Sequence, residues 1–240
     1  MTGRAGAGPG GETRHARSGR IAPLLLAGYL VVSAADLGGL LAGADTVHLL
    51  AKPLLMPLLA AYAAVRGGPG WLIAALLFGW GGDVALMVDH DTAFLLGMGS
   101  FAAGHLCYLR LFGRAPAPRT AGGVYAALLT AFLVAMWGDL PAGMRLPMAG
   151  YSLLLATMAW RSGALGRYAA AGGALFLLSD SLIAIGVAGR PQPPGHDFLV
   201  MLTYLAAQLL LTLGAPAGHG LGGIRRPTRA RAYRGKVETA

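Results

Sequence analysis

Charged residues are scarce in this sequence. Only 12% of its 240 residues are Asp, Glu, Lys or Arg, whereas 55% are hydrophobic, and the mean hydropathy is +0.59. A soluble domain carries about 25% charged residues, so this composition excludes an ordinary soluble globular fold. We therefore predict an all-α, polytopic membrane protein.

Cysteine is almost absent as well. Cys107 is the one cysteine, which excludes an intramolecular disulfide and a cysteine-rich metal site. The sequence also lacks an HExxH motif and any histidine-rich cluster, so a metal site has little support. We expect neither a metal nor an organic cofactor.

The basic residues that are present crowd both ends of the chain, and the net charge is +9. Nucleic-acid binding is one interpretation of such tails. Anchoring at an anionic membrane leaflet is favoured, because these residues flank apolar runs long enough to span a bilayer. The ten terminal basic residues are Arg4, Arg14, Arg17, Arg20, Arg225, Arg226, Arg229, Arg231, Arg234 and Lys236.

Long apolar runs separated by short Gly/Pro loops predict eight transmembrane helices. Each run is close to the roughly 20 residues that cross about 30 Å of hydrocarbon. A secretory signal peptide ending near Val32-Ser33-Ala34 is an alternative for the first run. We expect a disordered basic tail at 1–20, a membrane domain at 21–214 and a basic tail at 215–240. The spans are expected at 21–42, 47–65, 71–89, 93–112, 121–138, 145–161, 166–188 and 196–214.

The distribution of basic residues predicts the orientation. With the N-terminus inside, the cytoplasmic segments hold sixteen of the nineteen basic residues, and the outer loops hold only Arg145 and Arg190. We therefore expect both termini to be cytoplasmic, in a multi-pass protein of a bacterial plasma membrane.

Two apolar runs each contain an aspartate. Asp83 lies in ALLFGWGGDVALM (75–87) and Asp180 lies in GALFLLSDSLIAI (173–185). An acid in hydrocarbon is costly and usually marks a functional site. The likeness of the two runs suggests a parallel repeat of four plus four helices that places the two acids face to face. Chance alignment of apolar segments is the alternative.

Further polar groups are expected at similar depth. Counting about 1.5 Å per residue from the outer helix ends places Asp36 and Lys52 level with Asp83, roughly 8–10 Å deep. Asp180 and Tyr204 come out slightly deeper. Each has a structural interpretation: Lys52 can reach the headgroups or bridge the two aspartates, and Asp36 can pair locally. A functional pair of aspartates is favoured over a purely structural one.

Five segments of the chain form a recognisable set, namely KPLLMPLLAAYAA (52–64), LLFGWGGDVALM (76–87), FLLGMGSFAAGHLCYL (94–109), YSLLLATMAW (151–160) and ALFLLSDSLIAI (174–185). From about residue 21 to residue 214 the chain resembles the YhhN-like family of lysoplasmalogenases. The resemblance implies an integral-membrane hydrolase that cleaves lysoplasmalogens to a fatty aldehyde and glycerophosphoethanolamine or glycerophosphocholine. Its partners would be this lysophospholipid and membrane lipids.

The resemblance also implies site residues. Lys52, Asp83 and Asp180 occupy the family's Lys-Pro, Gly-Asp and Ser-Asp positions, and His105 and Tyr108 carry over from its next motif. Depth adds Asp36 and Tyr204. We expect five residues to bind substrate or to tune the pKa values of Asp83 and Asp180: Lys52, His105, Tyr108, Asp36 and Tyr204.

Vinyl-ether hydrolysis suits a pair of carboxyls. Protonation of the alkene carbon forms an oxocarbenium ion, to which water then adds. Two carboxyls that share a proton supply an acid and a base, as in glycosidases. We expect Asp83 to be the acid and Asp180 the base, with an apolar cleft between the halves for the alkenyl chain. Lys52 would hold the phosphate or keep one aspartate ionised.

Two rival functions stay open. Gly81-Gly82-Asp83 is similar to the Gly-x-Gly-Asp signature of intramembrane aspartyl proteases, although its first glycine is one position late. A small-molecule transporter coupled to protons would also use half-buried acids and a lysine. Broken helices at matching positions would favour the transporter.

Overall fold

The structure is a computed structural model, described here for residues 9–217, with side chains from residue 20 onward. It is all-α, as the composition predicts. The helices in chain order are α1 (Pro9–Ala42), α2 (Asp45–Val65), α3 (Gly70–Ala85), α4 (Asp91–Phe112), α5 (Arg119–Met136), α6 (Ala142–Ser162), the short 3-10 helix η1 (Gly163–Leu165), α7 (Arg167–Val187) and α8 (His196–Gly214).

Eight α-helices are confirmed within residues 9–217, and six of them are long and apolar enough to cross a membrane. The other two are α6 and α3, of which α3 has only 16 residues. The orientation and the internal repeat stay predictions, and residues 218–240 of the expected C-terminal tail lie outside the described residues.

Two helix limits differ from the expected ones by four residues or more. α1 begins at Pro9, within the segment expected to be a disordered tail. α3 ends at Ala85, four residues early, so Asp83 lies in its last turn. Gly81 and Gly82 have low helix propensity, which favours this early end. His90 Nδ1 then accepts from the Thr92 backbone N–H and caps the start of α4.

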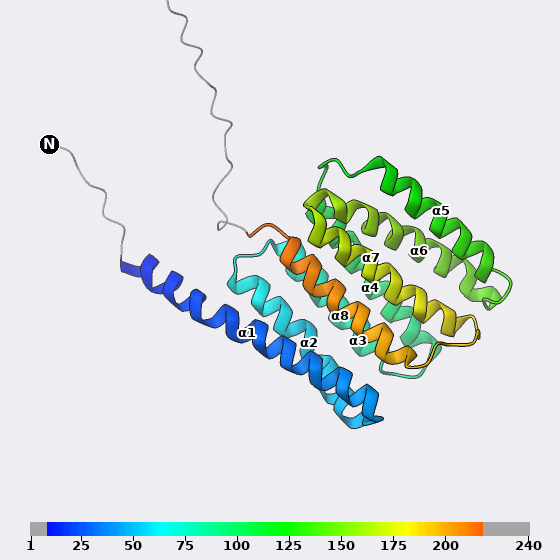
Figure 1. Ribbon diagram of the computed structural model, residues 1–240, viewed down its shortest axis with the longest axis horizontal. Coiled ribbons are helices and arrows are strands. Elements are labelled where there is room, and N and C mark those ends of the chain that lie inside the picture. Colours follow the sequence, from blue (N-terminus) through cyan, green and yellow to red (C-terminus); the bar gives the residue numbers. More distant parts are fainter. Residues whose placement is uncertain (1–8, 218–240) are drawn as a thin grey trace, which may run out of the picture.

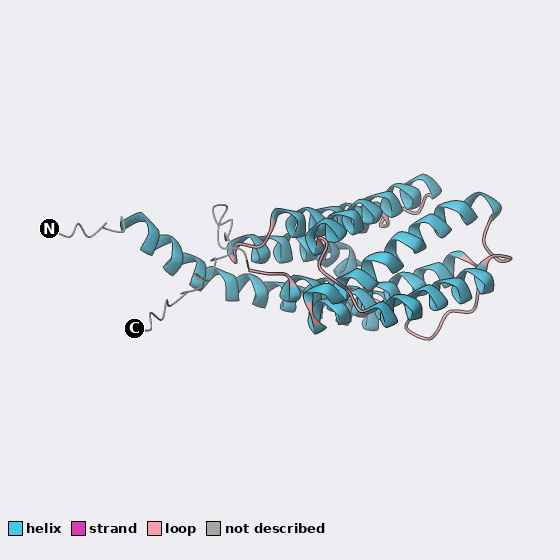
Figure 2. Cartoon of the chain, turned by 90° about the horizontal axis from the view of Figure 1, so that it is seen from above, coloured by secondary structure: helices cyan, strands magenta, loops and turns pink. Residues whose placement is uncertain are grey.

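The helices form an elongated bundle (Figure 1). α1 and α2 lie on one flank, α5 and α6 lie on the other, and α3, α4, α7 and α8 lie between them. Figure 2 shows the helices running along a common long axis, with the first half of α1 extending beyond the bundle. The most deeply buried side chains come from the central helices and also from α2, as Tyr108, Phe176 and Leu59 illustrate.

Small residues let these central helices approach closely. A Cβ on Gly172 would lie 2.9 Å from the Ala207 carbonyl oxygen of α8, and one on Gly173 would lie 2.9 Å from Ala159 Cα of α6. In the other half, a Cβ on Gly104 would lie 3.2 Å from the Ala75 carbonyl oxygen of α3. Such small-residue contacts are typical of membrane helix packing.

Gly173→Ala should therefore destabilise the bundle. The added methyl group meets backbone atoms of α6, which cannot rotate away, so we expect a loss of about 1–3 kcal/mol and a melting temperature lower by about 3 °C or more in detergent. Gly150→Ala in α6 is the matched control, because its Cβ would meet nothing within 4 Å. Equal melting temperatures for the two variants would contradict this packing.

α5 is attached differently from the other helices. Met136 is its one fully buried residue, and its main packing partner is α6. At its start, Trp160 Nε1 donates to the Pro118 carbonyl oxygen at 2.9 Å. At its end, Arg190 donates to the Ala135 carbonyl oxygen. α5 is thus held by polar contacts at both ends, and its middle faces a cavity.

Candidate functional site

Asp180 of α7 lies at the end of a short hydrogen-bonded chain. Tyr151 of α6 donates its hydroxyl proton to Asp180 Oδ2, and His105 Nε2 of α4 lies 3.1 Å from the same hydroxyl oxygen. Because Tyr151 has one proton to give, the Nε2–H tautomer of His105 fits this arrangement. His105 is 1% exposed, and its Nδ1 has no partner among the described residues. The Tyr151 hydroxyl therefore donates to Asp180, and the His105 imidazole donates to Tyr151 from behind it.

Asp83 of α3 belongs to a second chain of hydrogen bonds. Tyr204 of α8 donates to Asp83 Oδ2 at 2.8 Å, and Gln208 Nε2 donates to the Tyr204 hydroxyl at 3.2 Å. Tyr108 of α4 in turn donates to Gln208 Oε1 at 2.6 Å. A Cβ on Gly79 would lie 2.9 Å from Gln208 Nε2, so glycine at this position leaves room for the amide.

Two phenylalanines lie between the two chains. The Phe176 ring is 5.5 Å from the Tyr204 ring and 4.8 Å from the His105 ring, both edge to face. Phe101 makes edge contacts with Phe176 at 6.3 Å and with Tyr204 at 6.0 Å. The two aspartates thus belong to one central cluster, and no hydrogen bond of the described residues joins them directly.

A cavity of about 740 Å³ opens beside this cluster. Its walls come from α4, α5, α6 and α7, with Leu86 after α3, and α1, α2 and α8 contribute no lining residue. Among the described residues, Asp180 is the one charged residue of the lining, accompanied by the hydroxyls of Tyr125, Tyr151, Ser152 and Ser181. Asp83 does not reach the cavity. The cavity is lined from both halves of the chain, with Leu86, Phe94, Met98 and Phe101 from the first half, so it occupies the place of the expected apolar cleft but contains Asp180 without Asp83.

Lys52 and Asp36 lie away from this cavity. Asp36 is fully buried and pairs with His48 Nδ1 at 2.9 Å, while its other oxygen has no partner among the described residues. Lys52 is half-buried and forms no ion pair with any described carboxylate. The interpretation that Lys52 bridges Asp83 and Asp180 is therefore wrong. Local pairing of Asp36 is confirmed.

Sequence reasoning missed Tyr151 and His48 as polar partners of the aspartates. His48 precedes Lys52 by four residues on α2, so the two share a helix face, and that spacing could have identified it. Tyr151 lies in the quoted segment YSLLLATMAW, but nothing in that segment pairs it with Asp180. The link that Gln208 makes between Tyr108 and Tyr204 comes from the structure.

Comparison with known proteins supplies independent evidence. Residues 47–215 match the YhhN family. Lysoplasmalogenase TMEM86B of Sus scrofa is 40% identical over 154 residues, covering 62% of this chain and 66% of the relative. Lysoplasmalogenase TMEM86B of Homo sapiens is 39% identical over 137 residues, covering 56% and 58%. A lysoplasmalogenase of Mycobacterium tuberculosis is 32% identical over 192 residues, covering 70% and 72%.

The matched segment spans just under two thirds of the pig relative and less of the human one. No solved structure matches the chain. The family match nevertheless covers well over half of the sequence and runs from residue 47 within α2 to the end of α8, a region that carries both aspartates and all the cavity walls. The chain therefore belongs to the YhhN family.

Proposed function

We propose that the protein is a membrane hydrolase that cleaves the vinyl-ether bond of lysoplasmalogens. The observation that carries the proposal is Asp180, the one carboxyl that the described residues place in the wall of a largely apolar cavity. The cavity volume of about 740 Å³ falls within the roughly 300–1,000 Å³ that ligand pockets occupy. The relatives named lysoplasmalogenases support the same substrate class.

The reaction needs one proton, one water and one carboxyl in contact with the substrate. Protonated Asp180 gives its proton to the alkene carbon distal to the ether oxygen, which leaves an oxocarbenium ion and a carboxylate. Water adds to the carbon that bears the oxygen and returns its proton to Asp180. The hemiacetal then passes its hydroxyl proton, through Asp180, to the ether oxygen and separates into aldehyde and glycerophospho-alcohol.

Tyr151 and Asp83 support these reaction steps in different ways. The Tyr151 hydroxyl donates to Asp180, and a hydrogen bond to a carboxylate strengthens as the negative charge forms. Asp83 lies behind Phe101 and Phe176, outside the lining, so we assign it an electrostatic role. Its negative charge stabilises the oxocarbenium ion across a water-poor region, where charges interact strongly. In this proposal Asp180 takes both the acid and the base steps, in place of the expected division in which Asp83 is the acid and Asp180 the base, because only Asp180 lines the cavity.

The proposal is tested with purified protein in detergent. Lysoplasmenylethanolamine should release a fatty aldehyde, whereas the 1-alkyl lysolipid of the same chain length should be left intact, because it lacks the alkene that accepts the proton. The absence of aldehyde, or the release of fatty acid from a 1-acyl lysolipid at a comparable rate, would contradict the proposed function.

Tyr151→Phe should lower kcat about tenfold. The variant removes one hydrogen bond to a charged group, which contributes on the order of 1.5 kcal/mol, and leaves the aromatic wall in place. Tyr168→Phe is the matched control, since Tyr168 is exposed at the start of α7 and away from the cavity. Steady-state aldehyde release measures both variants, and an unchanged kcat in Tyr151→Phe would remove Tyr151 from the mechanism.

A further inference from the structure

The position of Asp180 along α7 decides which way the substrate lies. Seven residues separate it from Val187 at the end of the helix, or about 10 Å. Thirteen residues separate it from Arg167 at the start, or about 20 Å. With the vinyl ether at Asp180, the short glycerophosphate part reaches water only at the nearer end, which we call the Arg190 end. The apolar chain then runs toward the far end.

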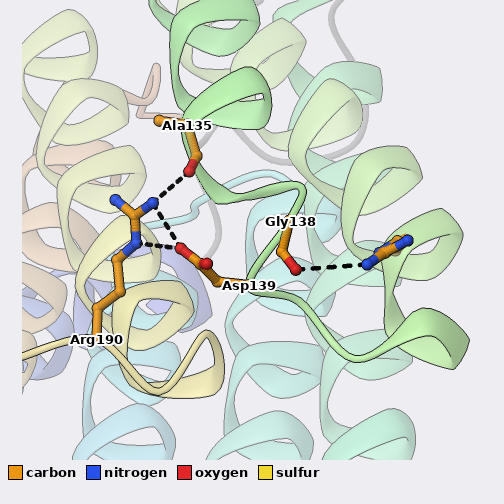
Figure 3. Close-up of polar contacts among 5 residues, drawn as sticks. Ala135, Gly138, Asp139 and Arg190 are labelled. Atoms are coloured by element: carbon orange, nitrogen blue, oxygen red, sulfur yellow. Dashed lines mark hydrogen bonds and ion pairs between the residues drawn. The ribbon is translucent and has the colours of Figure 1, made fainter.

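Two arginines lie at the Arg190 end, on either side of the loop that joins α5 to α6. Arg190 Nε donates to Asp139 Oδ2 at 2.6 Å, and one terminal nitrogen reaches the Ala135 carbonyl oxygen. Arg145 donates to the carbonyl oxygens of Leu140 at 3.2 Å and Gly138 at 3.4 Å. Figure 3 shows the other terminal nitrogen of Arg190 pointing away from Asp139 and Ala135. Both guanidinium groups thus retain further N–H donors that can bind a ligand.

A methionine-rich wall separates these arginines from the cavity. Arg145 precedes Met148 by three residues, about one helical turn, and Met148 belongs to both the wall and the cavity lining. Ala184, six residues before Arg190, also belongs to both the wall and the cavity lining. Methionine side chains are flexible and adapt to irregular shapes. The wall comprises Met136, Leu140, Met148, Ala184 and Ala188, with Met98, Phe132, Met144 and Val187 packed against it.

We propose that Arg190 and Arg145 bind the phosphodiester of the lysolipid headgroup while the alkenyl chain occupies the cavity. Paired guanidinium groups suit phosphate, because their planar donors match its oxygens. Asp139 holds Arg190 in place when no lipid is bound. That ion pair is 39% and 44% exposed, and exposed pairs are weak, so a phosphate can replace the carboxylate. This inference rests on the proposed function, which places the vinyl ether at Asp180.

Arg190→Gln tests the proposal. With lysoplasmenylethanolamine we expect KM to rise about tenfold or more and kcat to change little, since a charge-assisted contact to the substrate is lost. With 1-alkenylglycerol, which lacks phosphate, KM should stay at the wild-type value. Arg190→Lys keeps the charge and should recover part of the loss. Arg161→Gln is the matched control, because Arg161 also donates to a backbone carbonyl, that of Gly113.

Asp139→Asn separates this proposal from a purely structural clamp. Removing the competing carboxylate should lower KM for the phospholipid, opposite in sign to Arg190→Gln. If both variants raise KM alike, or if Arg190→Gln impairs the phosphate-free substrate equally, the pair is a clamp and the proposal is wrong. Inhibition by inorganic phosphate that Arg190→Gln abolishes, with KM for the lipid unchanged, would show a site for free anions and also overturn it.

Binding of a 1-alkyl lysolipid, which is not hydrolysed, keeps this inference distinct from the proposed reaction. Wild-type protein should bind it about tenfold more tightly than Arg190→Gln, whether or not aldehyde is formed from the alkenyl lipid. Equal affinities would reject the phosphate site while leaving the hydrolase proposal standing. Unequal affinities without any aldehyde release would reject the hydrolase proposal and leave the phosphate site standing.

Discussion

Asp180→Asn should lower aldehyde release about 1,000-fold or more. The amide cannot deliver a proton to the alkene carbon, and general acid–base groups contribute about 10²–10⁴-fold to a rate. The substitution keeps the size of the side chain, and its carbonyl oxygen can still accept from the Tyr151 hydroxyl. The loss should therefore appear in kcat, with little change in stability or KM.

The control for this variant is Asp89→Asn, which removes an exposed carboxyl from the loop between α3 and α4. It should keep wild-type turnover. Size-exclusion profiles and melting temperatures in detergent show whether each variant is folded. Folded Asp180→Asn protein that turns over within a few-fold of wild type would contradict the role of Asp180 as proton donor.

Asp83→Asn should lower kcat about 100-fold, less than the loss at Asp180. The asparagine oxygen still accepts from the Tyr204 hydroxyl, so the chain from Tyr108 to position 83 is retained and the negative charge is lost. Removing one preorganised electrostatic group from a water-poor site typically costs about 10²–10³ in kcat. KM should change little, because Asp83 does not line the cavity.

Tyr204→Phe is the comparison that separates the charge of Asp83 from its surroundings. It keeps the carboxylate and removes one donor, so its effect on kcat should be smaller than that of Asp83→Asn. A wild-type rate in Asp83→Asn, or a larger loss in Tyr204→Phe, would show that Asp83 serves the packing of α3 against α8 and not the reaction.

Much of the fold follows from the sequence because apolar runs near 20 residues long are hard to place anywhere but in membrane helices. The limits of α4 and α8 lie within two residues of those expected. Asp83, Tyr204 and Tyr108 were expected from depth or from the family resemblance, and the structure brings them into one chain of hydrogen bonds.

The parts that could not be predicted depend on the lateral arrangement of the helices. Depth along a helix follows from counting residues, but which neighbour a side chain faces does not. For this reason Lys52 was expected near Asp83 and Asp180, yet it makes no ion pair with either. Tyr151 pairs with Asp180 because α6 packs on α7. The cavity exists because α5 packs on α6 and does not pack closely on α7.

The most direct test of the account is hydrolysis of lysoplasmenylethanolamine in deuterium oxide, with the aldehyde analysed by mass spectrometry after immediate trapping. Proton transfer to the alkene carbon predicts one deuterium on the carbon next to the aldehyde carbonyl. It also predicts that Asp180→Asn slows the appearance of this labelled product, whereas Asp89→Asn does not. An aldehyde without deuterium at that carbon, or a labelled product formed at an equal rate by Asp180→Asn, would contradict carbon protonation by Asp180.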